Sequence, residues 1–261
     1  MVRQLTFSLL LMAVIACADD YILATGEDGT EIVYAADRMV YTNWLSDCVL
    51  WMPFPSDVGG GSYPDYSKEQ NDGSQSTVTN RPTWTDGAYV FDGIQDYIEI
   101  SDDSSLDITS ELTMTAWFKS EVTGATACGI IFDRRSDTGG EGYFCNINYD
   151  SDGIYFLIND GVNQIIDNRG SVGYNDTSWH SLGCTISLSS DVATIYIDGL
   201  QIGTNIDISS ITGTVTPSKP LMIGFYGRSP FNGAIDDARI YNIALTSNQV
   251  NQIYLDTKGA H

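Results

Sequence analysis

Short apolar runs with a two-residue period dominate this chain of 261 residues. Apolar or aromatic side chains alternate with polar ones, which is the pattern of a strand with one buried face and one solvated face. The pattern predicts strands over residues 48–54, 88–92, 95–101, 111–119, 128–134, 142–149, 153–158, 162–167, 178–188, 192–198, 200–206, 220–225 and 233–241. So many short strands at close intervals restrict the chain to an architecture built from β-sheets.

Asp-Gly pairs separate several of these runs. They stand at 86–87, 92–93, 152–153, 160–161 and 198–199. Both residues of such a pair tolerate positive φ, which two-residue hairpin turns require. The connections are also too short for the crossover helices that parallel strands need. We therefore predict an all-β fold, a two-sheet antiparallel β-sandwich of the jelly-roll type, and exclude a parallel α/β fold.

Only one stretch has a helical pattern. Residues 246–249 read Thr-Ser-Asn-Gln, which resembles a capping box, and Val250, Ile253 and Tyr254 follow at helical spacing. The sequence therefore predicts one short helical turn near the C-terminus.

The chain is strongly acidic. It holds 34 Asp and Glu residues against 12 Lys and Arg residues, for a formal charge of −22. A nucleic acid is thereby excluded as a partner, because a phosphate backbone requires a basic surface that releases its counterions. The acids are mostly Asp, a residue that favours turns and oxygen-rich cation sites over helical surfaces.

The first residues resemble a secretory signal over 1–18. Their apolar run from Leu5 to Ala16 is too short to span a bilayer. Ala16–Ala18 offers a cleavage site between small residues, whereas Val14–Cys17 resembles a lipoprotein signal that ends before Cys17 and leaves a lipid anchor there. Both routes predict export, the first to the extracellular medium and the second to the cell surface.

The remaining chain divides into two parts. Residues 19–44 form either an N-terminal extension or an extra hairpin, and residues 45–261 form the main domain. No later apolar stretch is long enough for a transmembrane helix.

Four cysteines remain besides Cys17, namely Cys48, Cys128, Cys145 and Cys184. An even number in an oxidising compartment permits two disulfides in any of three connectivities. Cys145 and Cys184 also alternate with apolar neighbours, as free thiols packed inside a sheet would. The sequence leaves both interpretations open.

The motifs together resemble the laminin-G-like, concanavalin A-like lectin/glucanase jelly roll, with the pentraxins as more distant relatives. The resemblance covers about residues 48–257 and lies in the order and spacing of its pieces. The pieces are CVLWMPF at 48–54, Asp65–Ser67, Asn71–Gly73, AYVFDG at 88–93, Asp96–Ile98, LTMTAWFK at 112–119, SWHSL at 178–182, IYIDG at 195–199 and FNGAIDDARIYN at 231–242. Members of this group include glycan-binding modules, adhesion domains and, in related groups, glycosidases and lyases, so function must be argued from sites.

The resemblance implies one structural Ca²⁺ ion. Its ligands would come from the loop around Asp65 and from Asp236 and Asp237 at the start of the last strand, with Asp92 and Asp96 as secondary candidates. Calcium takes six to eight hard oxygen ligands, which Asp-rich loops supply. The alternative is that these carboxylates cap strands and turns.

A glycan site needs an aromatic face and polar groups that reach the sugar hydroxyls. Tyr226, Arg228 and Phe231 lie in one loop, and Arg134 and Arg135 are candidates to complete the patch. We therefore predict these five residues as ligand-binding.

Catalytic patterns are absent from the sequence. Glycosidases of related groups carry two or three carboxylates alternating on one strand, and none of the seven Glu residues sits in such a run. His180 and the terminal His261 are the only histidines, and no nucleophile motif accompanies His180. We therefore predict no catalytic residue and no enzyme activity.

Taken together, the sequence predicts an exported, calcium-stabilised, non-catalytic module that binds extracellular carbohydrate or protein. The alternative is a structural or adhesion subunit of a cell-surface assembly that self-associates through a sandwich face or an edge strand. A polysaccharide-degrading enzyme ranks third.

Overall fold

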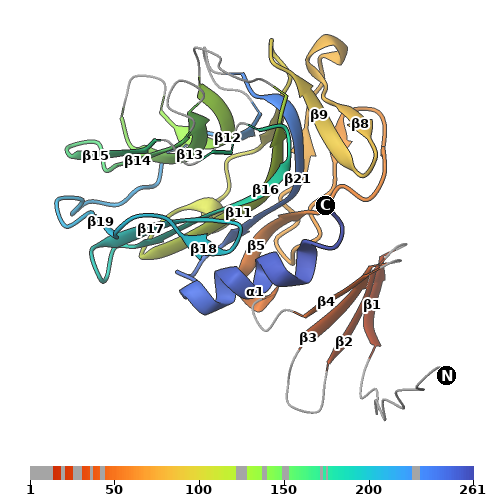
Figure 1. Cartoon of the computed structure of the whole chain (residues 1–261), viewed down its shortest axis with the longest axis horizontal. Helices are drawn as coiled ribbons and strands as arrows, with labels where there is room; N and C mark the ends of the chain where they lie inside the picture. Colours follow the sequence, from red (N-terminus) through yellow and green to blue (C-terminus); the bar gives the residue numbers. More distant parts are fainter. Residues whose placement is uncertain are drawn as a thin grey trace.

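Two antiparallel sheets packed face to face form the body of the protein (Figure 1). The computed structural model describes residues 14–18, 21–25, 31–35, 38–41, 45–121, 128–136, 140–148, 153–170, 173–174, 176–224 and 230–261. This architecture confirms the predicted two-sheet sandwich.

The eight-stranded sheet has, from edge to edge, β15 (Gln164–Arg169), β14 (Gly153–Asn159), β13 (Gly142–Asn148), β12 (Cys128–Arg135), β20 (Leu221–Ile223), β10 (Ile98–Ile100), β7 (Gly73–Ser74) and β6 (Ser62–Tyr63). The nine-stranded sheet has β18 (Leu200–Gln201), β17 (Val192–Ile197), β16 (Trp179–Ser187), β11 (Glu111–Ser120), β21 (Asn232–Tyr241), β9 (Ala88–Asp92) and β8 (Thr83–Thr85), with β19 (Ile206–Asp207) paired to β17 and β5 (Cys48–Met52) paired to β21. Three short 3₁₀ turns, Leu45–Asp47, Val78–Asn80 and Ser104–Leu106, connect these strands.

The core lies between the sheets and follows the alternation of the sequence. On β10, Ile98 and Ile100 are fully buried while Glu99 between them is partly exposed. On β13, Tyr143 and Cys145 point into the core in the same way. Alternation therefore fixes the register, because a one-residue slip would turn each apolar set outward.

Two of the five predicted Asp-Gly turns have the expected geometry, whereas Asp92 and Asp160 do not adopt positive φ and Asp152 lies outside the described residues. Between β8 and β9, Asp86 and Gly87 have φ values of 52° and 91°, and between β17 and β18, Asp198 and Gly199 have φ values of 49° and 73°. Positive φ at both central residues is the geometry of a type I′ turn, which matches the twist of paired strands. Many of the Asp residues thus have a role in the backbone.

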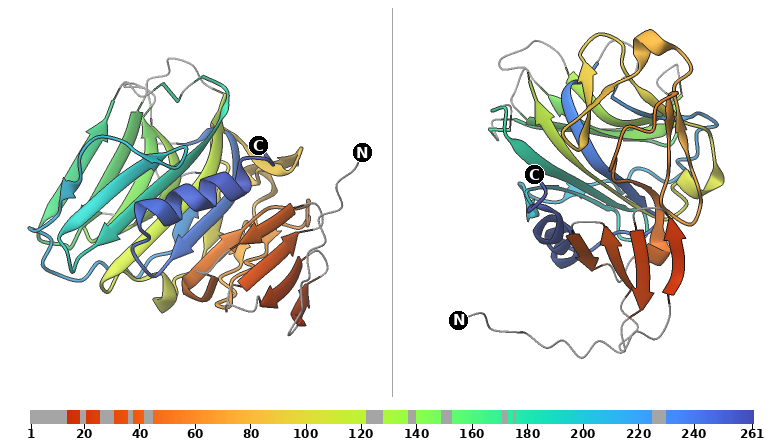
Figure 2. Two further views of the ribbon diagram at one scale, coloured as in Figure 1. Left: turned by 60° about the horizontal axis from the view of Figure 1, so that its bottom comes forward. Right: turned by 90° about the vertical axis from the view of Figure 1, so that its right-hand side faces the viewer.

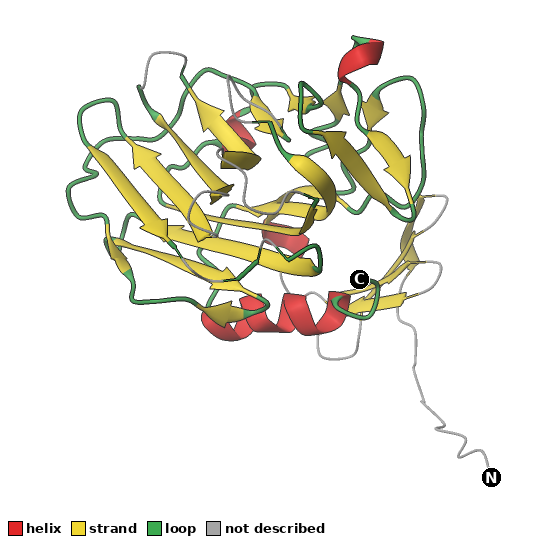
Figure 3. Ribbon diagram, turned by 45° about the horizontal axis from the view of Figure 1, so that its top comes forward, coloured by secondary structure: helices red, strands yellow, loops and turns green. Residues whose placement is uncertain are grey.

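Helix α1 (Ser247–Thr257) covers part of the outer face of the nine-stranded sheet (Figures 2 and 3). The capping box is present, because the Thr246 hydroxyl accepts from the backbone N–H of Gln249 and the Gln249 side chain accepts from that of Thr246. Val250 and Ile253 pack against residues that include Tyr196, and thereby fix the helix on the sheet.

A separate four-stranded antiparallel sheet lies beside α1 (Figure 1). Its strands are β1 (Val14–Ala18), β2 (Tyr21–Thr25), β3 (Glu31–Ala35) and β4 (Arg38–Tyr41). Residues 1–13 of the expected signal lie outside the described residues. In the part of the chain that the structure describes, no helix is long and apolar enough to cross a membrane.

Three cysteines are buried free thiols. They are Cys48, Cys145 and Cys184, and the side chains of Cys17 and Cys128 lie outside the described residues. Burial raises the pKa of Cys48 to about 12. Burial also raises the pKa of Cys184 well above its ordinary value, and the neighbouring thiol of Cys145 raises it further. Since the thiolate is the reactive form, Cys48 and Cys184 are expected to be inert in the folded protein, and burial shields all three thiols from reagents.

We predict that a thiol reagent such as iodoacetamide labels Cys48, Cys145 and Cys184 only after denaturation, because reagent access to these buried thiols requires unfolding. Peptide mapping by mass spectrometry, with and without guanidinium and in the absence of reductant, measures this. Failure of Cys145 and Cys184 to label even in the unfolded, unreduced protein would show that they form a disulfide and would contradict the prediction.

Candidate ligand-binding site

Asp65 is buried in a shell of hydrogen-bond donors. Its Oδ1 accepts from the backbone N–H groups of Trp51 (2.7 Å) and Ser67 (2.8 Å). Its Oδ2 accepts from the Ser67 hydroxyl (2.6 Å) and from the backbone N–H of Asn71 (2.7 Å). Both carboxylate oxygens are therefore engaged within the chain, in an arrangement that organises the loop after β5.

Asp237 pairs with a cation of the chain itself. It sits on β21 at φ 49°, and its carboxylate accepts from Arg239 at 3.0 Å and 2.7 Å and from the indole N–H of Trp51 at 2.8 Å. Burial opposes the charge on Arg239, but the carboxylate of Asp237 outweighs it and raises the pKa of Arg239. The adjacent Asp236 accepts from the backbone N–H of Asp237 (2.7 Å).

The carboxylates of Asp65 and Asp237 both have partners within the chain. They accept from two different nitrogens of Trp51, and the guanidinium of Arg239 neutralises Asp237. A hard cation requires several oxygens that converge on one point. Within the described ranges no group of three or more His, Cys, Asp or Glu side chains is placed to hold a metal.

Asp92 and Asp96, the secondary calcium candidates, are joined by a hydrogen bond in one short turn. Asp92 lies in the turn after β9 and accepts from the backbone N–H groups of Ile94 (2.8 Å) and Gln95 (3.2 Å). Asp96 is buried and accepts from the backbone N–H of Asp92 (3.0 Å). Burial raises the pKa of Asp96, so its carboxylate is the one that would gain most from a cation.

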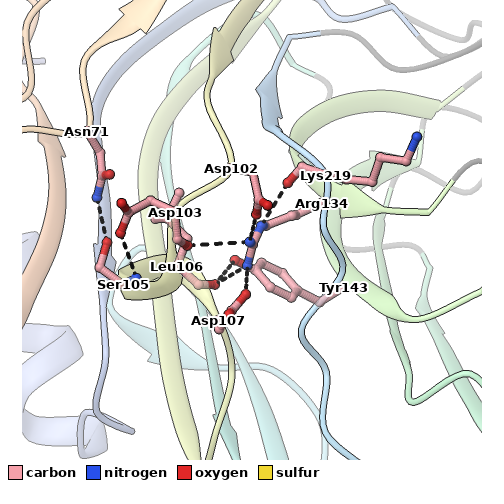
Figure 4. A network of polar contacts seen from close by, with 9 residues as sticks. All are labelled: Asn71, Asp102, Asp103, Ser105, Leu106, Asp107, Arg134, Tyr143 and Lys219. Atoms are coloured by element: carbon pink, nitrogen blue, oxygen red, sulfur yellow. Dashed lines mark hydrogen bonds and ion pairs between the residues drawn. The ribbon is translucent and has the colours of Figure 1, made fainter.

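Arg134 lies inside the sandwich, not on its surface (Figure 4). Its guanidinium donates to the carboxylates of Asp102 (2.6 Å) and Asp107 (2.7 Å). It also donates to the backbone carbonyls of Leu106 (2.7 Å) and Lys219 (3.1 Å). Burial opposes its charge, but Tyr143 and the two carboxylates together raise the pKa of Arg134. The residue therefore joins three chain segments and has no surface to offer a glycan.

Two other residues of the predicted glycan patch, Arg135 and Phe231, lie in the described part of the chain. Arg135 forms an ion pair with Asp133 and stacks over Phe144, with 4.3 Å between the guanidinium and the ring centre. Phe231 is fully buried against Phe91, and Tyr226 and Arg228 lie outside the described residues.

Arg134, Arg135 and Phe231 are the members of the predicted patch that lie in the described part of the chain. Two of them, Arg134 and Phe231, are buried, so these three residues do not share one surface.

A different site lies where α1 meets the nine-stranded sheet. A pocket of about 530 Å³ is lined by Trp117, Ser178, Trp179, Asp198, Tyr254, Lys258, Gly259 and His261. We call it the helix-side pocket. Its residues come from β11, the start of β16, the turn after β17, and the end of α1 with the residues that follow it.

Aromatic rings form one side of the helix-side pocket. Trp117 stacks on Tyr254 (centroids 5.6 Å apart) and on His261 (4.3 Å), and its indole N–H donates to the Thr257 hydroxyl (2.8 Å). Trp179 lies 5.0 Å from the His261 ring and is partly exposed. Contacts across 140 residues of sequence thus fix the aromatic surface.

The polar side of the pocket holds the Asp198 carboxylate, the Lys258 ammonium and the His261 imidazole, whose Nε2 lies 3.5 Å from Asp236 Oδ2. Asp198 is about a third exposed and is held by His180 Nδ1 (2.9 Å) and by the backbone N–H of Ser181 (2.9 Å). The hydrogen bond to Asp198 raises the pKa of His180. Lys258 places its Nζ 5.5 Å from the ring centre of Tyr254. The pocket therefore combines aromatic faces with an acceptor and a donor.

The sequence pattern did not predict that these residues line one pocket. Trp179 and His180 have the pattern of a strand start with a packing role, and Asp198 that of a hairpin turn. Tyr254 follows the helix period, which says only that it lies on the same face as Val250. Their proximity depends on where α1 docks, and no local pattern encodes that position.

One family model matches the chain. It is Laminin_G_3, described as the concanavalin A-like lectin/glucanases superfamily, and it matches residues 91–251. No curated protein matches the sequence.

Solved structures with the same fold include toxin binding domains. The binding domain of Paraclostridial Mosquitocidal Protein 1 has a TM-score of 0.65 at 14% identity, over 80% of this chain and 52% of that one. A structure of botulinum neurotoxin type C, whose cell entry is described as dependent on two ganglioside molecules, has a TM-score of 0.63 at 14% identity, over 84% of this chain and 52% of that one. The binding domain of botulinum neurotoxin DC in complex with rat synaptotagmin II has a TM-score of 0.61 at 14% identity, over 84% and 53%.

This likeness concerns the fold. The chain spans about half the length of these toxin domains. It places the protein among jelly-roll structures.

We predict that Arg134→Met lowers the free energy of unfolding by roughly 3–5 kcal/mol, because it leaves two carboxylates and a buried carbonyl without their partner. Lys68→Met is the matched control, since Lys68 is exposed and pairs only with Glu69 at 3.6 Å. Chemical denaturation of both variants measures the difference. Equal stability of the two variants would contradict a structural role for Arg134.

Proposed function

Because the chain belongs to the concanavalin A-like lectin/glucanase superfamily, we propose that it is an exported, non-catalytic module that binds extracellular carbohydrate or protein. The observation that carries this proposal is the helix-side pocket, in which Trp179 and Tyr254 face the same space as Asp198 and Lys258. Ligand sites combine apolar or aromatic walls with a few placed polar groups in this way.

The pocket's chemistry supports binding over catalysis. Hydrolysis of a glycosidic bond requires two carboxylates that face one sugar, one of them as acid. Asp198 supplies the carboxylate among the described residues that line the pocket, and hydrogen bonds from His180 and Ser181 hold it in place. A group fixed in this way is suited to accept a ligand's hydroxyl hydrogen.

The structural neighbours support both ligand classes. Cell entry of one botulinum neurotoxin is described as dependent on two ganglioside molecules, and another binding domain is in complex with synaptotagmin II. These neighbours support either a glycan or a protein as the ligand of this chain.

The edge strand β15 supports a second candidate function, that of an adhesion or assembly subunit. Strand β15 forms an open edge of the eight-stranded sheet, and Ile166 on it is 50% exposed. Val162 in the preceding turn is 89% exposed. Exposed apolar residues on an edge strand are able to pair with a strand of another chain.

Export is part of the proposal and rests on the sequence of residues 1–18. Cleavage after a small residue would release the protein, whereas lipidation of Cys17 would hold it at the cell surface. Mass spectrometry of the mature N-terminus separates the two routes.

We predict that the purified protein binds members of a glycan array and remains monomeric in sedimentation experiments. The pocket supplies the first result, and repulsion between copies that each carry a charge of −22 favours the second. If no glycan on the array is bound and the protein self-associates in a concentration-dependent way, the result would support the assembly subunit instead. Hydrolysis of an arrayed polysaccharide would contradict the non-catalytic assignment.

Calcium is proposed for the turn of Asp92 and Asp96 alone. We predict that saturating calcium raises the melting temperature by roughly 5 °C and that a chelator reverses the rise. Asp96→Asn should abolish the shift, whereas Asp86→Asn, a change in another Asp-Gly turn, should retain it. Absence of a shift in the unmodified protein would remove calcium from the proposal.

A further inference from the structure

We propose that the helix-side pocket takes one pyranose ring of a neutral glycan, stacked on Trp179, with its hydroxyl groups shared between Asp198 and Lys258. This inference rests on the proposed binding function and names the ligand class of that site. The argument uses the rigidity of the pocket, its polar groups and its charge balance.

The aromatic surface is preformed. Trp117 is buried and held by its hydrogen bond to Thr257 and by stacking on Tyr254 and His261. His261 packs in turn against Trp179. A rigid aromatic wall binds the C–H face of a sugar ring without the cost of ordering flexible side chains.

The position of the Asp198 carboxylate is also fixed before a ligand binds. Asp198 lies at a positive φ in its turn, and His180 and Ser181 hold its two oxygens at 2.9 Å each. His180 is itself held by Asp176, with 3.2 Å between its Nε2 and the carboxylate. Each oxygen of a carboxylate has more than one acceptor site, so Asp198 keeps capacity for a ligand hydroxyl.

The charges of the pocket favour neither sign of ligand. Asp198 and Lys258 oppose each other there, and the His261 imidazole lies 3.5 Å from Asp236, so a charged ligand that is attracted by one group is repelled by the other. Hydroxyl groups satisfy both, because each one donates to a carboxylate and accepts from an ammonium. The formal charge of −22 further disfavours acidic glycans by long-range repulsion.

The size of the pocket agrees with this ligand. Its volume of about 530 Å³ lies within the range of roughly 300–1,000 Å³ that small-molecule sites occupy. It is open to solvent on the side of Ser178 and Lys258, so a longer chain is able to continue outside while one ring is held.

The experiment compares ligands of three charge classes on the full chain. Isothermal titration calorimetry with lactose and cellobiose as neutral probes, sialyllactose as the anionic probe and a glucosamine disaccharide as the cationic probe measures the preference. We expect a neutral disaccharide to bind at least tenfold more tightly than either charged probe.

Variants then locate the binding. We expect Trp179→Ala to weaken binding of the neutral disaccharide by roughly tenfold or more, which corresponds to about 1.4 kcal/mol. Asp198→Asn and Lys258→Met should each weaken it severalfold, and Trp179→Phe should restore part of what Trp179→Ala loses. Trp84→Phe is the control, because Trp84 lies in β8 away from the pocket and donates to the Phe54 carbonyl (3.0 Å). Thermal melts confirm that each variant is folded.

The outcomes distinguish this inference from the function on which it rests. If Trp179→Ala and Asp198→Asn leave glycan binding unchanged, the assignment of the ligand to the helix-side pocket is overturned. The proposed binding function would still stand. Tighter binding of a charged probe would overturn the charge argument. No binding of any glycan by the folded protein would overturn this inference and the carbohydrate half of the proposed function, and would leave a protein ligand.

Discussion

The buried contact between Trp51, Asp237 and Arg239 links the first strand of the domain to the last. Trp51 lies on β5, and Asp237 and Arg239 lie on the neighbouring β21. The backbone N–H of Trp51 also binds Asp65, so one residue orders the loop after β5 as well. The guanidinium of Arg239 supplies the positive charge that a buried carboxylate requires. The guanidinium of Arg239 therefore lies beside Asp237, where the family resemblance implied a metal ion.

The fold was predictable because its information is local. Alternation along β10 and β13, the Asp-Gly turns at 86–87 and 198–199, and the capping box at Thr246 all depend on neighbouring residues. The same local pattern could not say that Arg134 and Arg135, adjacent on β12, would point to opposite faces with different partners. The glycan patch and the calcium site required contacts between distant segments, and composition and motif order do not encode such contacts.

The Asp residues illustrate how one residue type serves different roles. Asp160 accepts four backbone N–H groups, from Val162, Asn163, Thr212 and Gly213. The bond from Asn163 and the others hold the pKa of Asp160 below its ordinary value, so it stays charged while it joins two loops. Many of the acidic residues therefore order backbone turns.

The position of the helix-side pocket connects ligand binding to the docking of α1. Trp179 and Asp198 belong to the sheet, whereas Tyr254 and Lys258 belong to the end of the helix. A ligand that contacts both groups is bound fully only when α1 lies on the sheet, so its binding energy adds to the packing of Val250 and Ile253. The apolar contacts of α1 thus position the site, and the site in turn stabilises the last element of the fold.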